Sequence, residues 1–330
     1  MIEASRRSIV PLLICACLSG LASAGADGAT EQEELLRWVQ TLRYQARDEQ
    51  ALRVCDMLLA ADPECTEALI WRGVILLGMS DFDSAYEDFS EALRYGALHP
   101  MAVVGRARAL GGRGDLRAAQ REAVDASTIC SQAIDEGRAD AMTWYTRGVA
   151  RLLLAHTGAL QDFFTALGLD ASLLDASLEV ANIYRASGRL NDALERMNRA
   201  VEVRPDYAVG YLTRARIHFQ LENYDAAVTD CDRAIEINPG FARAWHNRGL
   251  VNIRRGEIEE SISDLTAAIA VRPDYASAYF YRGQSHASLG DIDSAREDLE
   301  RARELDPDGW AGKEASEMLG ELHRQAPPDQ

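Results

Sequence analysis

A repetition of 34 residues in the second half of the chain constrains its fold more than any other feature of the sequence. Residues 242–275 read ARAWHNRGLVNIRRGEIEESISDLTAAIAVRPDY, and residues 276–309 repeat the same order of large, small and turn-forming side chains. The matching pairs are Trp245 with Tyr279, Gly249 with Gly283, Gly256 with Gly290, and Pro273 with Pro307. A fixed period of this length predicts an array of stacked units, each of which buries its apolar face against its neighbours.

Eight units follow this period. They begin at Gln32, Thr66, Pro100, Ala141, Leu174, Ala208, Ala242 and Ala276. The last four units are gapless segments of 34 residues, and the unit at Ala141 is one residue shorter. About seven additional residues follow the unit at Pro100, within 127–140, and form the main irregularity of the array.

Each unit carries the pattern of two antiparallel helices. A large residue often stands at position 4 and a small one at position 8, while alanine at positions 20 and 27 lets two helices approach closely. Glycine at position 15 suits the left-handed end of the first helix. Proline at position 32 ends the second helix because it lacks an amide hydrogen. The pattern therefore predicts an all-α fold.

This combination of residue types and positions resembles the tetratricopeptide repeat (TPR). The resemblance covers 32–309 and is clearest from Ala141 onward. It implies an α-α superhelix, or solenoid, of about eight helix pairs of 34 residues. Met318, Leu319 and Leu322 share one face of the segment that follows, so we expect 310–324 to form a capping helix.

The sequence thus divides into six parts. They are a signal peptide at 1–24, a short leader at 25–31, three N-terminal units at 32–140, five C-terminal units at 141–309, the capping helix at 310–324 and a tail at 325–330. The predicted signal peptide has Arg6 and Arg7 before an apolar run at 9–21 and small residues at 22–24. We expect export to a bacterial periplasm or cell envelope, with secretion as the alternative. The arginines also resemble a twin-arginine export motif, and Cys17 lies in a weak lipobox that would make it a lipid anchor.

Position 7 is arginine in six units, and position 23 is acidic in the same six. The pairs are Arg72 with Asp88, Arg106 with Glu122, Arg147 with Asp162, Arg214 with Asp230, Arg248 with Asp264, and Arg282 with Asp298. The other two units have Trp38 with Val54 and Val180 with Arg196, so the arginine and the acid are present or absent together. This correlation predicts an ion pair between the two helices of a unit, or between neighbouring units.

The composition disfavours several kinds of partner. The net charge is −17 and the pI is near 4.8. Such a surface repels nucleic acid and anionic lipid, so neither is an expected partner, and no transmembrane segment is expected in the mature chain. The thiols of Cys55, Cys65, Cys130 and Cys231 could pair in an oxidising compartment. Two of them, however, fall at an otherwise apolar repeat position, which favours buried thiols.

Motifs for catalysis or metal binding do not occur. The sequence has no HExxH, no Walker loop, no GxSxG and no paired Cys/His nucleophile set. We therefore expect no enzyme activity, no metal and no cofactor. His218 and His286 share position 11 with Tyr184, which favours packing in the core, and His246 at position 5 has no second metal ligand beside it.

The resemblance to tetratricopeptide repeats implies a concave groove lined by positions 2, 5, 9, 12 and 13 of the first helices. The residues that it places there are Tyr145, Asn182, Arg185, Leu212, Arg216, Phe219, Arg243, His246, Arg254, Phe280 and Gln284. Basic and aromatic side chains on an acidic protein suit an extended peptide with an acidic side chain or a C-terminal carboxylate. A groove that is only solvated is the alternative.

The leading hypothesis is an exported, non-catalytic scaffold or adaptor that binds a protein or an extended peptide in its concave groove. The alternative is a structural subunit of an envelope complex that docks by its convex face or by the 127–140 insertion. A cytosolic co-chaperone with a carboxylate clamp is less favoured. Asn182 and Arg243 match two clamp positions, but Leu178, Thr213 and Asn247 occupy the others. The identity of the partner stays open.

Overall fold

The computed structural model describes residues 31–96 and 99–325, and every regular element in them is an α-helix. The all-α fold of helix pairs is confirmed. The signal peptide at 1–24, the leader up to residue 30, the Cys17 anchor and the tail from residue 326 lie outside the described residues. None of the described helices is both long and apolar enough to span a bilayer.

The described residues form two compact units, one of 31–43, 48–96 and 99–113 and one of 44–47 and 114–325. The helices of the first unit are α2 (Glu31–Tyr44), α3 (Asp48–Ala61), α4 (Thr66–Gly78), α5 (Phe82–Tyr95) and α6 (Pro100–Gly112). Those of the second are α7 (Leu116–Asp135), α8 (Ala141–Leu153), α9 (Ala159–Leu169), α10 (Leu174–Ala186), α11 (Leu190–Val203), α12 (Ala208–Gln220), α13 (Tyr224–Ile237), α14 (Ala242–Arg255), α15 (Ile258–Val271), α16 (Ala276–Ser288), α17 (Ile292–Leu305) and α18 (Trp310–Gln325).

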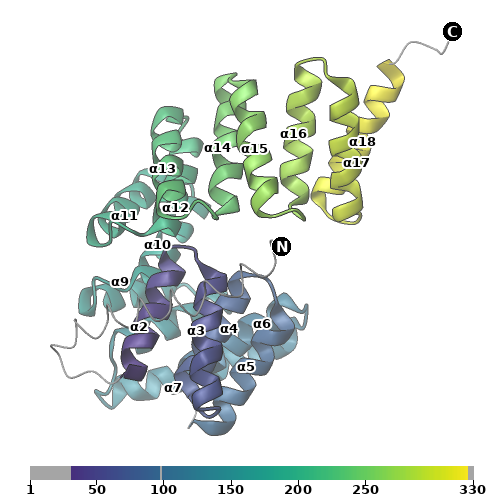
Figure 1. Cartoon of the computed structure of the whole chain (residues 1–330). Helices are drawn as coiled ribbons and strands as arrows, with labels where there is room; N and C mark the ends of the chain where they lie inside the picture. Colours follow the sequence, from purple (N-terminus) through teal and green to yellow (C-terminus); the bar gives the residue numbers. More distant parts are fainter. Residues whose placement is uncertain (1–30, 97–98, 326–330) are drawn as a thin grey trace. The chain divides into compact units, whose positions relative to one another are not determined.

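Consecutive helices pack side by side within each unit, as α14, α15, α16 and α17 do in Figure 1. The last helix, α18, packs against α16 and α17. Its Leu319 and Leu322 join Phe280 and Leu299 in one buried cluster. Helix α18 therefore covers an apolar face that the last repeat would otherwise expose to water.

The turn between the two helices of a repeat depends on one residue in the left-handed region. In four repeats this is a glycine with φ between 75° and 85°: Gly114, Gly188, Gly256 and Gly290. The other four have a residue with a side chain there, at φ between 53° and 65°: Ala46, Ser80, Ala155 and Glu222. The left-handed conformation costs such residues about 1–2 kcal/mol. The packing of the helix pair therefore imposes this turn even where the sequence has no glycine.

Glycine at position 8 lets the second helix of a repeat approach the first. A Cβ atom on Gly73 would lie 2.8 Å from the ring of Phe89, and one on Gly148 would lie 2.6 Å from the ring of Phe163. Both rings are fully buried. The large side chain of the second helix thus fills the space that the glycine leaves on the first helix. This explains why a small residue on one helix faces a large residue on the other.

In five repeats the arginine at position 7 holds the acid at position 23 with two hydrogen bonds. Arg72 donates from Nε and Nη2 to the two oxygens of Asp88, at 2.9 and 2.7 Å. The same arrangement joins Arg147 to Asp162, Arg214 to Asp230, Arg248 to Asp264 and Arg282 to Asp298. In the sixth predicted pair, Arg106 belongs to one compact unit and Glu122 to the other, so this pair stays a prediction.

The remaining nitrogen of each guanidinium, Nη1, reaches the second helix of the preceding repeat. These contacts join Arg72 to Asp56, Arg147 to Ser131, Arg214 to Asn198, Arg248 to Asp232 and Arg282 to Thr266. Four of the arginines also lie over the aromatic ring at position 4, with distances to the ring centroid of 4.6–5.5 Å: Arg147, Arg214, Arg248 and Arg282. One guanidinium therefore links its own two helices and the neighbouring repeat. We call this series the arginine ladder.

Each carboxylate of the ladder is at most 6% exposed. Burial raises the pKa values of Asp88 and Asp264 despite the opposing hydrogen bonds from Arg72 and Arg248. The loss of an arginine would thus leave a buried and poorly solvated charge.

The repeat that begins at Leu174 interrupts the ladder. Val180 stands in place of the arginine and is fully buried. Arg196 stands in place of the acid, and its Nε atom is buried without a hydrogen-bond partner among the described residues. Burial lowers the pKa of Arg196. Helices α10 and α11 are consequently joined here by packing without an ion pair.

The additional residues within 127–140 lengthen helix α7 as far as Asp135, and 136–140 connect it to α8. Helix α7 has 20 residues, compared with 14 in α5 and α11. Seven residues correspond to about two helical turns, so the extension keeps the same face toward the core. Ala123 and Cys130 are accordingly both fully buried. The irregularity of the sequence is thus absorbed without a change in packing.

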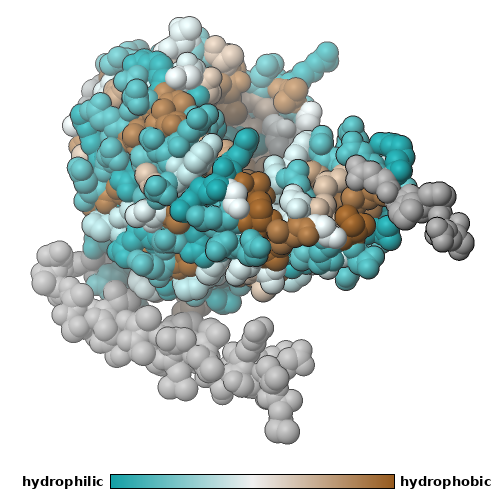
Figure 2. All heavy atoms as spheres, turned by 90° about the horizontal axis from the view of Figure 1, so that it is seen from above, coloured by the Kyte–Doolittle hydropathy of each residue, from teal (hydrophilic) through white to brown (hydrophobic). Residues whose placement is uncertain are grey.

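The four cysteines of the described residues are free and buried. Cys55 and Cys231 occupy the core position that Phe89 and Leu265 occupy in other repeats. Burial raises the pKa of Cys55 to about 12, which keeps its thiol protonated and unreactive. On the face shown in Figure 2, the surface is mostly hydrophilic and hydrophobic residues occur in separate groups.

Installing the missing ion pair tests the role of the ladder. We expect Val180→Arg and Arg196→Asp each to lower the free energy of unfolding, because each buries a charge without a partner. The double variant should recover about 1–3 kcal/mol relative to the sum of the single changes. Urea unfolding of the wild type, both single variants and the double variant measures this coupling.

A matched control combines Val180→Arg with Arg199→Asp, because the Arg199 side chain on the same helix is 62% exposed. The control should show additive losses. Additive losses in the Val180→Arg/Arg196→Asp variant as well would show that no pair forms at this position.

Candidate functional site

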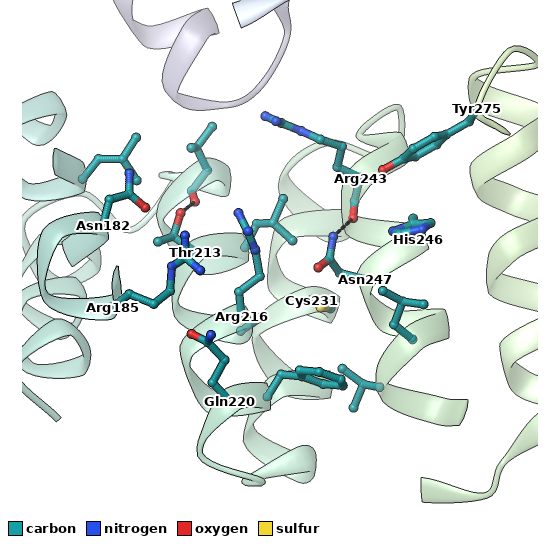
Figure 3. A pocket seen from close by; sticks show the side chains of 17 residues that line it. Asn182, Arg185, Thr213, Arg216, Gln220, Cys231, Arg243, His246, Asn247 and Tyr275 are labelled. Carbon is teal, nitrogen blue, oxygen red and sulfur yellow. Dashed lines mark hydrogen bonds between the residues drawn. The ribbon is translucent and has the colours of Figure 1, made fainter. Parts of the chain in front are cut away.

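A pocket of about 650 Å³ lies across the first helices of three consecutive repeats in the second unit, α10, α12 and α14 (Figure 3). Its lining consists of Leu178, Asn182 and Arg185 from α10; Val209, Leu212, Thr213, Ala215, Arg216, Phe219 and Gln220 from α12; Arg243, His246, Asn247, Leu250 and Val251 from α14; and Cys231 and Tyr275. The first helices all present the same face to one side of the stack. Residues at equivalent repeat positions therefore become neighbours in the pocket wall.

Seven of the eleven residues predicted for the groove line this pocket: Asn182, Arg185, Leu212, Arg216, Phe219, Arg243 and His246. Arg254 is exposed nearby, with its guanidinium carbon 5.8 Å from the ring centroid of Phe219. Gln284 is on α16 and does not line the pocket.

Two predicted groove residues are part of the core instead. Tyr145 is 8% exposed and packs its ring against Phe163, with centroids 5.8 Å apart. Phe280 is 6% exposed and packs against Tyr281 and Trp310. Neighbouring aromatic rings cover both side chains, and neither residue lines this pocket.

Three arginines, one from each helix, supply the charge of the pocket. Arg185, Arg216 and Arg243 extend into the same space in Figure 3, and no aspartate or glutamate lines it. No carboxylate in the described part of the chain forms an ion pair with any of the three. Burial and the charges of Arg185 and Arg243 lower the pKa of Arg216. Arg216 and Arg243 are exposed and Arg185 is half-buried, so the three side chains, here called the pocket arginines, are like charges in one partly solvated space.

Neutral polar groups complete the lining. The Thr213 hydroxyl donates to the carbonyl of Val209 at 2.8 Å, and the Asn247 amide donates to the carbonyl of Arg243 at 2.7 Å. No described hydrogen bond engages the side-chain amides of Asn182 and Gln220. Those two amides therefore remain available as donors to a molecule in the pocket.

His246 is a packed part of the pocket wall. It is 8% exposed and stacks on Tyr275, with ring centroids 4.8 Å apart. Its Nε2 atom lies 3.4 Å from the hydroxyl of Ser277, and its Nδ1 atom is buried without a described partner. Burial, together with the charge of Arg272, lowers the pKa of His246 to about 4. The imidazole is therefore neutral near pH 7.

The prediction of the groove missed several lining residues. Tyr275 stands at the end of its repeat, outside the first helix, and enters the pocket by stacking on His246. Leu178, Thr213 and Asn247 entered the sequence analysis only as departures from a carboxylate clamp, yet all three line the pocket. These three residues stand at positions 5 and 6 of consecutive first helices. That regular placement was the signal that could have identified them.

Two histidines at position 11 are not simple packing residues. His218 Nε2 lies 3.9 Å from Asp230, and His286 Nδ1 lies 3.3 Å from Asp291. At the same position Asn252 donates to Asp264 at 2.9 Å. In two of these repeats position 11 lies beside the ladder acid, because it is one turn from the arginine at position 7, whereas His286 lies beside the N-cap Asp291 of α17.

The chemistry that this arrangement offers is hydrogen-bond donation and positive charge. Among the described residues, no group of histidine, cysteine and acidic side chains is placed to hold a metal ion. The Cys231 thiol lines the pocket but is fully buried, and burial raises its pKa. The pocket is thus suited to bind an anionic group.

Three family models described as tetratricopeptide repeat match residues 178–242, 216–282 and 276–308. With the helix pairs described above, these matches show that the chain belongs to the tetratricopeptide repeat proteins. No curated protein matches the chain.

Solved structures resemble parts of the chain. The Cut9–Hcn1 hetero-tetramer of the APC/C has a TM-score of 0.63 at 15% identity, over 89% of this chain and 57% of that chain. MamA has a TM-score of 0.45 at 25% identity, over 51% of this chain and 96% of its own. YrrB, described as a TPR protein with an unusual peptide-binding site, has 0.46 at 22%, over 57% and 97%. The first similarity supports the repeat fold alone.

His246 makes the stability of the protein depend on pH. Its pKa in the folded state is about 4, below the ordinary value of 6.5, so below pH 6.5 the unfolded chain takes up a proton that the folded chain resists. The folded state should therefore lose about 3 kcal/mol between pH 6.5 and 4 from this residue. The variant His246→Gln cannot titrate and should lose less stability over this range in urea unfolding. His156→Gln, at an exposed position, is the control and should follow the wild type. Parallel curves for all three proteins would contradict the assignment.

Proposed function

We propose that this chain is a non-catalytic scaffold that binds an acidic segment of a partner protein or peptide in the pocket formed by α10, α12 and α14. The observation that carries the proposal is the set of three pocket arginines without any acidic neighbour in the lining. Like charges that share one partly exposed space repel one another in the free protein. An anionic ligand relieves this repulsion as it binds.

The geometry supports an extended ligand. The three pocket arginines come from three successive repeats, so charged donors are spread along the stack. The lining also contains the apolar side chains Leu212 and Leu250. A peptide that crosses the helices can place an acidic group among the arginines and its apolar groups on the leucines. This division of roles is typical of peptide recognition, in which a few polar groups determine orientation.

The charge of the rest of the molecule makes an acidic ligand more selective for the pocket. The chain carries a net charge of −17, and the face shown in Figure 2 is mostly hydrophilic. An acidic ligand is therefore repelled by most of the surface and attracted at the pocket. Binding should weaken as salt is added, because salt screens the interaction between partly exposed charges.

Export is a further part of the proposal, supported by the arginines, apolar run and small residues within 1–24. Mass spectrometry of the protein purified from its native cell tests this part. Cleavage after Ala24 gives a chain that begins at Gly25. A lipidated N-terminus at Cys17 would show that the exported protein is anchored to a membrane. An intact N-terminus would contradict export.

Arg216 provides the sharpest test of the pocket, because it lies between the other two pocket arginines. The probe is a fluorescein-labelled peptide of ten residues with four glutamates, and its match has four glutamines. We expect Arg216→Gln to weaken binding of the glutamate peptide about 10- to 100-fold, the effect of a lost hydrogen bond to a charged group. Fluorescence anisotropy measures the affinity, and thermal unfolding shows whether the fold is kept.

Arg301→Gln is the matched control, since this arginine pairs with Glu304 at the surface and the variant has the same net charge. The control should bind like the wild type. Equal binding of the glutamate and glutamine peptides, or unchanged binding by Arg216→Gln, would exclude the pocket. Partner capture that survives Arg216→Gln would instead favour docking by another surface, such as the 127–140 insertion.

A further inference from the structure

We propose that the pocket selects a group with two negative charges on one centre, namely the phosphomonoester of a phosphorylated side chain. This inference rests on the proposed function, because it specifies which acidic group the peptide presents. It starts from the contrast between two sets of arginines in the same repeats. The ladder arginines hold a carboxylate at 2.6–3.1 Å, whereas no described carboxylate pairs with the pocket arginines.

The charge of the lining favours a dianion. Arg185, Arg216 and Arg243 contribute three positive charges, and the lining has no acid. His246 adds no charge, because its pKa is about 4. One carboxylate would leave two positive charges uncompensated in the pocket, whereas a doubly ionised phosphomonoester would leave one. A dianion is therefore the better electrostatic match.

The number of N–H donors in the pocket also favours a phosphomonoester. Each guanidinium presents a planar fork of N–H donors, and the three forks come from three different helices. A carboxylate has two oxygens in one plane. A phosphomonoester has three terminal oxygens in a tetrahedral arrangement, so it can accept from forks that approach from different directions. Figure 3 shows the three arginine side chains entering the pocket from separate ribbons.

Arg216 is on the middle helix of the three, α12, between α10 and α14. Burial and the charges of Arg185 and Arg243 lower its pKa, so an anion beside it meets a positive charge that its neighbours disfavour. An anion among them removes this repulsion in proportion to its own charge. The gain in binding free energy from a second negative charge on the ligand should therefore depend most strongly on Arg216.

The experiment compares one labelled peptide in three forms, with serine, glutamate or phosphoserine at the same central position. The remaining residues are glycine, alanine and two flanking glutamates. At pH 7.5 and constant ionic strength, we expect the phosphoserine form to bind at least ten-fold more tightly than the glutamate form. At pH 5.5 this advantage should shrink several-fold, because the second ionisation of a phosphomonoester lies near pH 6.

The comparison of binding at pH 5.5 and pH 7.5 can be interpreted because the pocket itself keeps its charge between these values. The titratable groups that face the pocket are the three arginines, His246, Cys231 and Tyr275. His246, with a pKa of about 4, is neutral throughout, and burial raises the pKa of the Cys231 thiol. Any change of the phosphoserine advantage between pH 5.5 and 7.5 therefore reports on the ligand.

Variants complete the test. Arg216→Gln should reduce the advantage of phosphoserine over glutamate at least five-fold, and Arg301→Gln should leave it unchanged. Free O-phosphoserine is added to distinguish a phosphorylated side chain of a peptide from a small phosphorylated molecule. We expect it to bind more weakly than the phosphopeptide, and equal affinity would overturn the assignment to a peptide.

The outcomes separate the two proposals. Binding of the glutamate form that depends on Arg216, without tighter binding of the phosphoserine form, would overturn the dianion inference and leave the proposed function intact. Binding of neither form would overturn both.

Discussion

The arginine at position 7 shares one guanidinium among the acid of its own repeat, the second helix of the preceding repeat and, in four repeats, an aromatic ring. These contacts prevent the first helix from rotating about its axis. Residues two positions away point about 200° from the arginine, because a helix turns about 100° per residue. Positions 5 and 9 therefore face the opposite side, and His246 and Arg216 at those positions line the pocket. On α12 and α14 the ladder thus lies on the face opposite the pocket.

Two kinds of arginine consequently occur on the same helices. On α12, Arg214 belongs to the ladder and has its carboxylate, while Arg216 lies in the pocket and has none. The same chemical group stabilises the stack on one face and remains available for a ligand on the other. Helix α10 differs, since Val180 replaces the ladder arginine there. The pocket is therefore bounded on one side by a repeat without a ladder arginine.

Much of the fold could be predicted from the period and from the types of residue that recur. The helix pairs follow from proline after the second helix and small residues where the helices meet, since both act locally. The residues of the ladder could be paired because arginine and acid vary together, although the added contact to the preceding repeat could not. Side chains such as Glu222 adopt a left-handed turn that only packing requires. Phe280 was predicted for the groove, but the rings of Tyr281 and Trp310 pack against it.

The sequence by itself determined the repeat, its helix pairs and the face on which each residue of a first helix lies. These properties depend on contacts within one period, which recur in the order of residues. The tertiary structure alone decided that Arg185, Arg216 and Arg243 share one space and that no acid accompanies them. Long flexible side chains from separate helices meet according to the spacing between repeats. That spacing arises from the packing of all the helices together, so no single period contains it.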